Sequence, residues 1–194
     1  IRDRTGAANG IGSSILKKLS DYKFKIYALD KDKRKLKTIC NETGAFPLNI
    51  DVTNIDLLYS KLSKLDVDIL INNAGIGNGI EGLLKSSKGD ILKSTRVNYE
   101  SILHILKILV PKMVKKRNGH IFLIGSIAGL YPTDSAIYSS QKTAIHKIAQ
   151  SLRIELSGSR VKLTEITPGR TKTSFANKIF SSNKKKKELS LIHI

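Results

Sequence analysis

The sequence is poor in several kinds of residue, and each shortage excludes a class of protein. Its 194 residues include a single cysteine, Cys40, which excludes an internal disulfide and a cysteine-based zinc site and favours a reducing compartment. No apolar run reaches the roughly 18 residues that a membrane-spanning helix needs. Residues 1–4 also lack the features of a signal peptide. We therefore expect a cytoplasmic protein with no membrane partner.

Acidic residues are also scarce. There are 16 Asp and Glu against 34 Lys and Arg, which gives a formal net charge of +18, and such a charge suggests a nucleic-acid partner. However, 26 of the 34 basic residues are lysines scattered along the chain, whereas recognition of bases and phosphates relies mainly on arginine. We favour a solvated, lysine-rich surface, and the same interpretation applies to the lysine run at 184–187. We expect no specific nucleic-acid partner.

Short apolar runs alternate with segments of helical periodicity through most of the chain. We expect strands at 25–29, 68–71, 120–124 and 161–166 and helices at 11–19, 102–114 and 144–156. One face of the last helix carries apolar residues at helical spacing: Ile145, Ile148, Ala149, Leu152 and Leu156. This alternation is typical of a three-layer α/β fold with a doubly wound parallel sheet, whose ligands bind beyond the carboxyl ends of the strands. The length fits one domain.

Both ends of the chain depart from this pattern. A doubly wound domain normally opens with a buried apolar strand, yet only the charged residues 1–4 precede the first glycine-rich segment. We therefore expect the first strand to be missing. Residues 181–194 show no clear element, and we expect them to form a disordered or non-native tail in place of the C-terminal elements of the domain.

A glycine-rich turn occupies residues 5–12, with Gly6, Gly10 and Gly12 in the spacing Gly-x-x-x-Gly-x-Gly. Glycine allows the backbone to turn sharply or to approach a ligand, and the N-terminus of the following helix offers N–H groups to a pyrophosphate. The spacing differs by one residue from the common dinucleotide fingerprint, and such turns also occur for steric reasons alone. The turn therefore predicts a nucleotide site only together with other residues.

The residues after the next strand bear on the choice of cofactor. Asp30 follows Gly12 by 18 residues, where a carboxylate can accept hydrogen bonds from an adenosine ribose and repel a 2′-phosphate. Lys31, Lys33 and Arg34 lie beside it and can instead attract that phosphate. The pattern favours NAD and leaves NADP possible, while an ordinary turn residue is the alternative for Asp30.

A second group of polar residues lies further along the chain. Ser126 follows the strand at 120–124, Tyr138 comes 12 residues later, and Lys142 lies four residues after Tyr138, on the same helix face. A cation beside a phenol favours the phenolate, and each pKa unit corresponds to about 1.4 kcal/mol. A Tyr and a Lys four residues apart are usually a surface pair, so the pair alone predicts little.

Together, the motifs identify a family. They occur in the order and approximate spacing of the short-chain dehydrogenase/reductase family, which the sequence resembles from residue 5 to about 180. The matching elements are Thr5-Gly6-x-x-x-Gly10-Ile11-Gly12, Asp51-Val52, Asn72-Asn73-Ala74-Gly75, Asn98, Ser126, Tyr138-x-x-x-Lys142 and Pro168-Gly169. Residues 68–180 also resemble the branch of serine 3-dehydrogenase and 3-hydroxy acid dehydrogenases.

The resemblance implies a single NAD(P)-binding Rossmann domain over 1–194 and an oxidoreductase that interconverts a secondary alcohol and a ketone. Tyr138 would be the general acid/base, Lys142 would lower its pKa and hold the nicotinamide ribose, and Ser126 would bind the substrate oxygen. Asn98 would maintain the site and a water-linked proton route. The cofactor would contact Tyr138, Lys142 and the following residues: Gly6, Asn9, Gly10, Ile11, Gly12, Asp30, Asp51, Val52, Asn72, Ala74, Gly75, Pro168, Gly169, Thr171 and Thr173.

Departures from the family pattern leave an alternative open. Gln141 stands in the Tyr motif where the family usually has a small residue, and we expect it to crowd the helix packing without removing a catalytic group. Altered ends predict weak cofactor binding, so a catalytically impaired or non-catalytic nucleotide-binding relative is the alternative. The resemblance also suggests a homodimer or homotetramer through helices at 100–116 and 138–156. No metal site is expected, since four histidines lack ligand spacing: His104, His120, His146 and His193.

Overall fold

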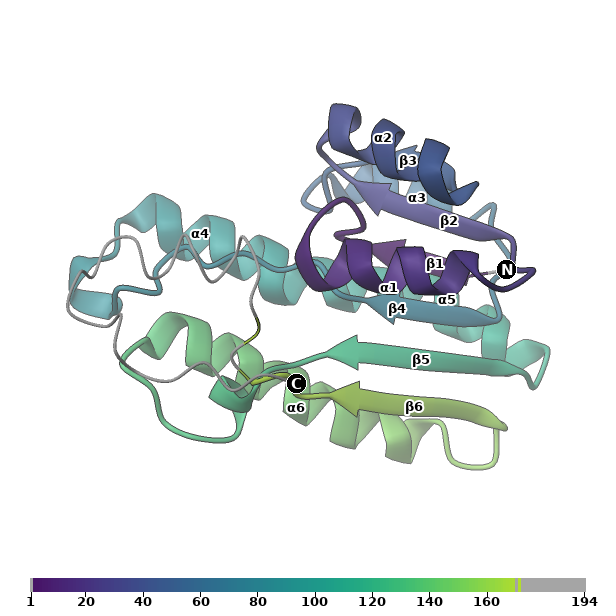
Figure 1. Ribbon diagram of the computed structural model, residues 1–194. Helices are drawn as coiled ribbons and strands as arrows, with labels where there is room; N and C mark the ends of the chain where they lie inside the picture. The colour runs from purple at the N-terminus through teal and green to yellow at the C-terminus, as the bar shows by residue number, and fades with distance from the viewer. Residues whose placement is uncertain (1, 170, 172–194) are drawn as a thin grey trace.

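The computed structural model describes residues 2–169 and 171, with side chains from Gly6 onward (Figure 1). Its sheet has six strands in the order β3-β2-β1-β4-β5-β6, and every neighbouring pair is parallel. The strands are β1 (Arg2–Thr5), β2 (Ile26–Asp30), β3 (Phe46–Asn49), β4 (Ile69–Asn72), β5 (Gly119–Ile124) and β6 (Val161–Ile166). The predicted doubly wound parallel sheet is confirmed.

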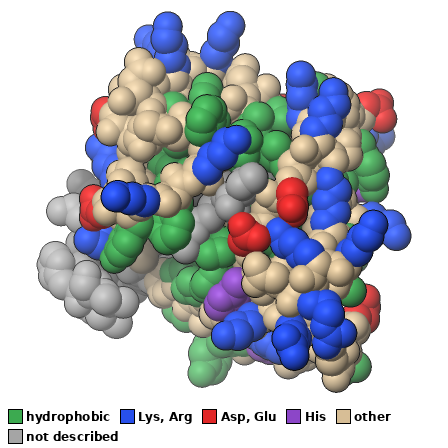
Figure 2. Space-filling model, turned by 90° about the vertical axis from the view of Figure 1, so that its right-hand side faces the viewer, with side chains coloured by type: hydrophobic (Ala, Val, Ile, Leu, Met, Phe, Trp, Pro, Cys, Tyr) green, Lys and Arg blue, Asp and Glu red, His purple; other side chains and the backbone are tan. Residues whose placement is uncertain are grey.

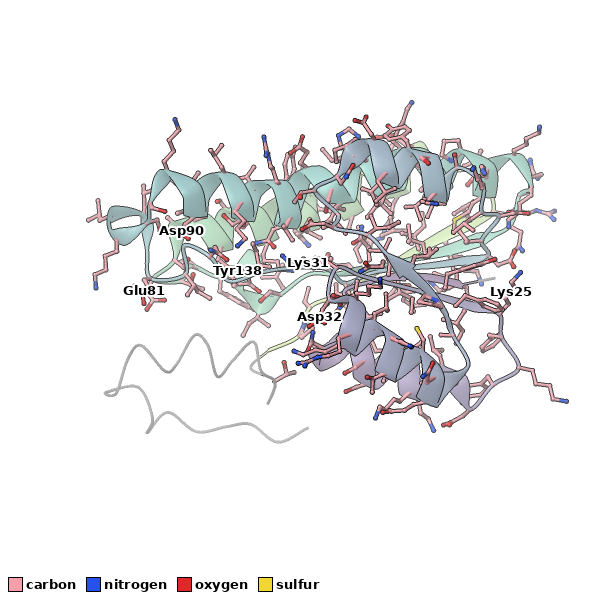
Figure 3. The ribbon with its side chains drawn as sticks, turned by 90° about the horizontal axis from the view of Figure 1, so that it is seen from above. Lys25, Lys31, Asp32, Glu81, Asp90 and Tyr138 are labelled. Carbon is pink, nitrogen blue, oxygen red and sulfur yellow. The ribbon has the colours of Figure 1, made fainter. Side chains whose placement is uncertain are left out.

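Helices cover both faces of the sheet, so the predicted three layers are confirmed (Figures 1 and 3). The α-helices are α1 (Gly10–Ser20), α2 (Lys33–Thr43), α3 (Ile55–Leu62), α4 (Lys88–Thr95), α5 (Ser101–Lys115) and α6 (Ala136–Glu155). Two short 3-10 helices, η1 (Leu83–Lys85) and η3 (Ile127–Gly129), lie in loops, and a π-helical turn, η2 (Arg96–Glu100), joins α4 to α5.

Two apolar clusters hold the layers together. On one face, Leu16 of α1 and Leu36 of α2 pack in a small cluster with β2. On the other face, α3, α5 and α6 share a larger cluster that includes Leu109, Ile121 and Ile145, each fully buried. Removal of this apolar surface from water drives the helices onto the sheet. The predicted apolar face of α6 is confirmed, because its residues belong to the larger cluster or pack against it.

The expectation of a missing first strand is wrong. Arg2–Thr5 form β1 in the middle of the sheet, where Arg2 pairs with Ile26 of β2 on one side and with Ile69 of β4 on the other. Strand pairing uses backbone N–H and C=O groups, so two flanking strands can hold a segment whose side chains give no apolar signal. The expected tail at 181–194 and the missing C-terminal elements lie outside the described residues.

The strand order reverses direction between β1 and β4, and folds of this kind have a ligand-binding crevice at the carboxyl ends of the strands at that point. β1 and β4 are neighbours in the sheet but lead to helices on opposite faces, so the loops that follow them separate. In Figure 1 the arrows of β2, β4, β5 and β6 point to this end of the sheet. The glycine-rich turn follows β1, and Asn72 ends β4. The fold therefore brings these two predicted motifs into contact at this end of the sheet.

One face of the molecule fits the expectation of dispersed positive charge. Figure 2 shows the face at the amino ends of the strands, where Lys and Arg side chains are spread among polar, acidic and apolar ones rather than gathered in one stripe. Several lysines are paired, as Lys116 is with Asp66 and Asp68. Within the described ranges, no helix combines the length and apolarity needed to cross a bilayer.

Candidate active site

The glycine-rich turn has a geometry that favours glycine. Gly6 and Gly10 adopt left-handed φ values of 63° and 51°. A Cβ on Gly12 would overlap the carbonyl oxygen of Gly6 and would lie 2.9 Å from Nδ2 of Asn73. The N-terminus of α1 therefore packs directly on the turn. The positive end of the helix dipole and its first N–H groups face the crevice, as an anion site requires.

Neighbouring strands fix the turn in place. The N–H of Ala8 donates to Oδ2 of Asp30 over 3.0 Å, and the N–H of Asp32 donates to Oδ1 of the same carboxylate over 3.0 Å. From the other side, Nδ2 of Asn73 donates to the Gly6 carbonyl over 3.1 Å. Asp30 is therefore more than a turn residue, since it joins the end of β2 to the glycine-rich turn. Sequence reasoning did not select Asn73 from the Asn-Asn-Ala-Gly motif.

Asn9 and Asp51 complete this side of the crevice. The Asn9 side chain makes no cap bond to α1, and its Oδ1 accepts a hydrogen bond from Nζ of Lys35 over 3.1 Å. Oδ1 of Asp51 accepts from the N–H and hydroxyl of Thr53, at 3.0 and 2.9 Å. Burial acts to raise the pKa of Asp51, but these bonds and the nearby Lys31 outweigh it and hold the pKa below its ordinary value.

The predicted Ser126 and Tyr138 lie together on the other side. Ser126 caps η3, with its Oγ accepting from the N–H of Ala128 over 3.1 Å, and Tyr138 lies in the first turn of α6. Burial raises the pKa of Tyr138, and a hydrogen bond with the Ser126 hydroxyl opposes that rise only in part. The phenol is therefore protonated at neutral pH. In Figure 3 Tyr138 and Lys31 lie toward the carboxyl ends of the strands, whereas Lys25 lies toward their amino ends.

Lys142 lies one helical turn after Tyr138 and is buried. Its Nζ donates to the carbonyl of Ile124 over 3.0 Å and lies 5.8 Å from the centre of the Tyr138 ring. Burial lowers the pKa of Lys142 to about 8, and the attraction of Glu165 partly opposes this change. The lowering of the Tyr138 pKa that we expected from Lys142 is not found, because burial of the phenol dominates and the ammonium is bound to Ile124.

Close backbone packing positions the helix that carries these residues. A Cβ on Gly129 would lie 2.6 Å from the carbonyl oxygen of Lys142, so η3 packs on the backbone of α6. Oγ1 of Thr143 donates to the Gly129 carbonyl over 3.1 Å. The N–H of Ile127 donates to the carbonyl of Pro168 over 3.1 Å, which brings the segment after β6 beside Ser126. These contacts fix the relative positions of Ser126, Tyr138 and Lys142.

The remaining cofactor candidates are spread around the same end of the sheet. Val52 is buried in the larger core, and Asn72 is buried where β4 ends. Gly169 and Thr171 are half-buried after β6, whereas Thr173 lies outside the described residues. Sequence reasoning thus selected residues from four separate loops that the fold brings to one edge. Also at this edge are Ile11, Ala74 and Gly75.

Asn98 lies in the π-helical turn η2 and is buried. Its Oδ1 accepts from the N–H of Ile76 over 2.8 Å, and its Nδ2 donates to the carbonyl of Ile76 over 2.9 Å. The same Nδ2 donates to Oε1 of Gln141 over 2.8 Å. The crowding that we expected from Gln141 is wrong, because its side chain fits between α6 and η2 with hydrogen bonds at both ends of its amide.

The histidines take part in local contacts. His104 contacts Tyr59, His120 contacts the Thr164 hydroxyl, and His146 contacts the Glu165 carboxylate at 2.7 Å. His193 lies outside the described residues. In the part of the chain that the structure describes, no three His, Cys, Asp or Glu side chains are grouped as a metal site would require.

Comparisons with known proteins agree with this geometry. The model of the short chain dehydrogenase family matches residues 4–184. An uncharacterized short-chain type dehydrogenase/reductase of Sinorhizobium fredii is 31% identical over 186 residues, which cover 95% of this chain and 75% of that protein. The NADP-dependent 3-hydroxy acid dehydrogenase YdfG of Escherichia coli K12 is 30% identical over 193 residues, which cover 95% of this chain and 78% of that protein.

Solved structures give the same result. Serine dehydrogenase from Escherichia coli superposes with a TM-score of 0.84 at 28% identity, covering 93% of this chain and 88% of that one. A closed form of serine dehydrogenase complexed with NADP+ superposes with a TM-score of 0.87 at 29% identity, covering 94% and 77%. Fold, ordered motifs and family match therefore lead to one conclusion: the chain belongs to the short-chain dehydrogenase/reductase family of oxidoreductases.

Proposed function

We propose that this chain is an NAD(P)-dependent oxidoreductase that interconverts a secondary alcohol and a ketone. The observation that carries the proposal is the hydrogen-bonded pair of Ser126 and Tyr138, with the buried Lys142 one helical turn away. Two hydroxyls that share a hydrogen bond can both reach one substrate oxygen. They lie at the same edge of the sheet as the glycine-rich turn, where ligands of such folds bind.

The residues of the turn fit a dinucleotide. A Cβ at Gly6 or Gly12 would press on Asn73 or on neighbouring backbone, so glycine lets the turn pack closely against the N-terminus of α1, whose N–H groups would bind a pyrophosphate. Asp30 and Asp51 would face the adenosine ribose and its neighbourhood, and Thr171 and Thr173 would hold the nicotinamide carboxamide. When bound, the nicotinamide supplies or accepts the hydride. The adenosine side of the cofactor would also contact Asn9, Gly10, Ile11, Val52, Asn72, Ala74 and Gly75. The nicotinamide side of the cofactor would contact Pro168 and Gly169.

The protein residues would handle the proton and the charge on oxygen. During reduction, the protonated Tyr138 would donate its proton to the carbonyl oxygen, and the Ser126 hydroxyl would donate a hydrogen bond to the same atom. Lys142, with a pKa of about 8, is mainly cationic at neutral pH and would hold the nicotinamide ribose. In oxidation the Tyr138 phenolate would accept the alcohol proton. Reduction should therefore fall, and oxidation should rise, as the pH approaches the Tyr138 pKa.

A substrate panel tests the proposal. The purified chain is mixed with NAD or NADP and with 3-hydroxy acids, serine, sugars or steroids, and the absorbance of the reduced nicotinamide is followed. The names of the relatives put 3-hydroxy acids and serine first. We expect turnover with at least one of these classes. Tight nucleotide binding without turnover on any substrate would instead favour a non-catalytic relative. That alternative depends mainly on an absent first strand, whereas the structure contains β1.

We propose that Asp30 sets a preference for NAD and that nearby basic residues allow NADP to bind as well. The carboxylate is held at the crevice by Ala8 and Asp32, where it would lie near a 2′-phosphate. Lys31 follows Asp30 directly, and Lys35 contacts Asn9. NADP also appears in the names of relatives and of structural neighbours. The sequence-based preference for NAD thus stays a prediction.

The substitution Asp30→Ser is expected to shift the preference toward NADP. Loss of one charge about 4 Å from a phosphate is worth about 1 kcal/mol or more, which corresponds to at least about fivefold in the ratio of kcat/KM values. Steady-state kinetics with both cofactors measures the ratio. Asp21→Asn removes a charge at the far end of α1, where Asp21 pairs with Lys18, and serves as the control. An unchanged ratio in Asp30→Ser would contradict the assignment.

We also propose that the chain forms a homodimer or homotetramer through α5 and α6. These helices carry exposed apolar side chains, including Leu103, Val114 and Ile154, the last of which is 78% exposed. Contact with a second copy would remove this surface from water. Light scattering of the purified chain is expected to give a dimer or tetramer mass, and a monomer mass at micromolar concentration would contradict the proposal.

A further inference from the structure

We propose that Gln141 is a positioning residue, whose buried amide holds Asn98 in one orientation and fixes the start of α6 against η2. The inference rests on the proposed function and deepens it by adding a residue to the catalytic site. Gln141 stands between Tyr138 and Lys142 in the sequence, at the place where the family usually has a small residue. The proposal depends on the contacts of the Gln141 side chain and not on its place in the motif.

The buried amide of Gln141 has hydrogen-bond partners at both of its ends. Gln141 is only 7% exposed, and burial of an unbonded amide is costly. Its Oε1 accepts from Nδ2 of Asn98 over 2.8 Å, and its Nε2 donates to Oγ of Ser94 over 3.1 Å and to Oγ1 of Thr95 over 3.3 Å. Both ends of the amide are therefore engaged, and every partner belongs to α4 or η2. We call these four residues the Gln141 network.

The hydrogen bonds of the Gln141 network run in one direction. The Ile76 N–H donates to Oδ1 of Asn98, which identifies Nδ2 as the group that faces Gln141. At the other end, the Ser94 hydroxyl donates to the carbonyl of Asp90 over 2.7 Å, so it offers Gln141 a lone pair. A flipped amide at position 141 would place donor against donor and acceptor against acceptor. Gln141 therefore supports the same orientation of the Asn98 side chain that the backbone of Ile76 requires.

Gly75 and α6 connect the Gln141 network to the proposed reacting groups. Gly75 lies between Asn98 and Lys142, because a Cβ on Gly75 would be 3.5 Å from Oδ1 of Asn98 and 3.9 Å from Nζ of Lys142. Lys142 also follows Gln141 directly on α6. A shift of Asn98 or of this turn of α6 therefore moves the lysine relative to Tyr138. A small residue at 141 would be too short to span the gap between α6 and Ser94.

The test replaces the amide in two ways. Gln141→Met keeps the length of the side chain and removes its hydrogen bonds, and we expect kcat to fall about tenfold with a smaller change in KM. Gln141→Glu keeps the shape of the side chain, but its carboxyl group can donate a hydrogen bond to Oγ of Ser94 only when it is protonated. The Glu variant should therefore be closest to the unmodified chain at low pH and lose kcat as the pH rises. Gln150→Met makes the same change on the exposed part of α6 and should leave kcat unchanged.

A double-mutant cycle separates positioning from simple stabilisation. Gln141→Met is measured alone and in the Asn98→Ala background, where its effect on kcat should shrink to less than about twofold because the partner is gone. Equal effects in both backgrounds, or unchanged kcat with only lower thermal stability, would overturn the proposal. If the unmodified chain shows no turnover on any substrate, the proposed function is refuted. The role of Gln141 is then tested by a second readout.

That second readout is hydrogen–deuterium exchange of the cofactor-free chain. Loss of the Gln141 network should increase exchange over 94–100 in Gln141→Met and leave it unchanged in Gln150→Met. Fluorescence of NADPH checks that both variants bind the nucleotide. Exchange over 94–100 that does not differ between the unmodified chain and Gln141→Met would overturn the inference whether or not the chain has activity.

Discussion

Tyr138→Phe is expected to lower kcat by about 10² to 10⁴, which is the usual contribution of a general acid or base. The substitution removes the hydroxyl that hydrogen-bonds to Ser126 and keeps the buried ring in place. The fold and the glycine-rich turn should therefore be preserved. Stopped-flow or steady-state kinetics gives kcat, and fluorescence titration with NADPH should give a dissociation constant within about twofold of the unmodified chain.

The pH dependence sharpens this prediction. Burial raises the pKa of Tyr138, so alcohol oxidation by the unmodified chain should increase with pH as the phenolate forms, whereas ketone reduction should decrease. The residual activity of Tyr138→Phe should lack this slope. Tyr22→Phe removes the same atom from an exposed ring after the end of α1 and is the matched control. Full activity in Tyr138→Phe would refute the role of the phenol.

Gly12→Ala should weaken binding of the nucleotide by roughly 5- to 150-fold, because overpacking of this kind costs about 1–3 kcal/mol. The added methyl group would overlap the carbonyl of Gly6 and press on Asn73, so the glycine-rich turn must move away from α1. The atoms displaced are those that shape the proposed pyrophosphate site. Isothermal titration calorimetry with NAD and NADP measures the loss.

A second glycine provides the control for stability. Gly44 ends α2 with a φ of 68°, and a Cβ there would meet nothing within 4 Å. Gly44→Ala should therefore destabilise the fold through backbone strain, by about 1 kcal/mol, without affecting nucleotide binding. If Gly12→Ala lowers the melting temperature but binds NAD and NADP as tightly as Gly44→Ala does, the glycine-rich turn is not the nucleotide site.

Much of the fold could be predicted from the sequence because its signals are local. Apolar runs such as 120–124 and the periodicity of Ile145 and Ala149 report burial directly, and each appears in the structure as expected. β1 could not be predicted in this way. Its place in the sheet depends on backbone pairing with β2 and β4, to which the charged side chains of residues 2–4 give no clue.

The site, like the fold, could be predicted from the sequence only in part. The order of motifs predicted which residues gather at the edge of the sheet, but not the direction of their hydrogen bonds. The two carboxylate oxygens of Asp30, the bond from Asn73 to Gly6 and the contacts of Gln141 all join residues far apart in sequence. The pKa of Tyr138 also depends on burial, which the Tyr–Lys spacing does not report.

Transfer of deuterium is the most direct test of the central claim, that this chain catalyses hydride transfer between a nicotinamide and a carbinol carbon. NADPH or NADH carrying deuterium at the transferred position is incubated with a panel of 3-keto acids and other ketones, and the products are examined by mass spectrometry. We predict an alcohol that has gained one deuterium on carbon with the unmodified chain, formed at least about 10²-fold more slowly with Tyr138→Phe. Tight nucleotide binding with no deuterated alcohol from any ketone would contradict the account.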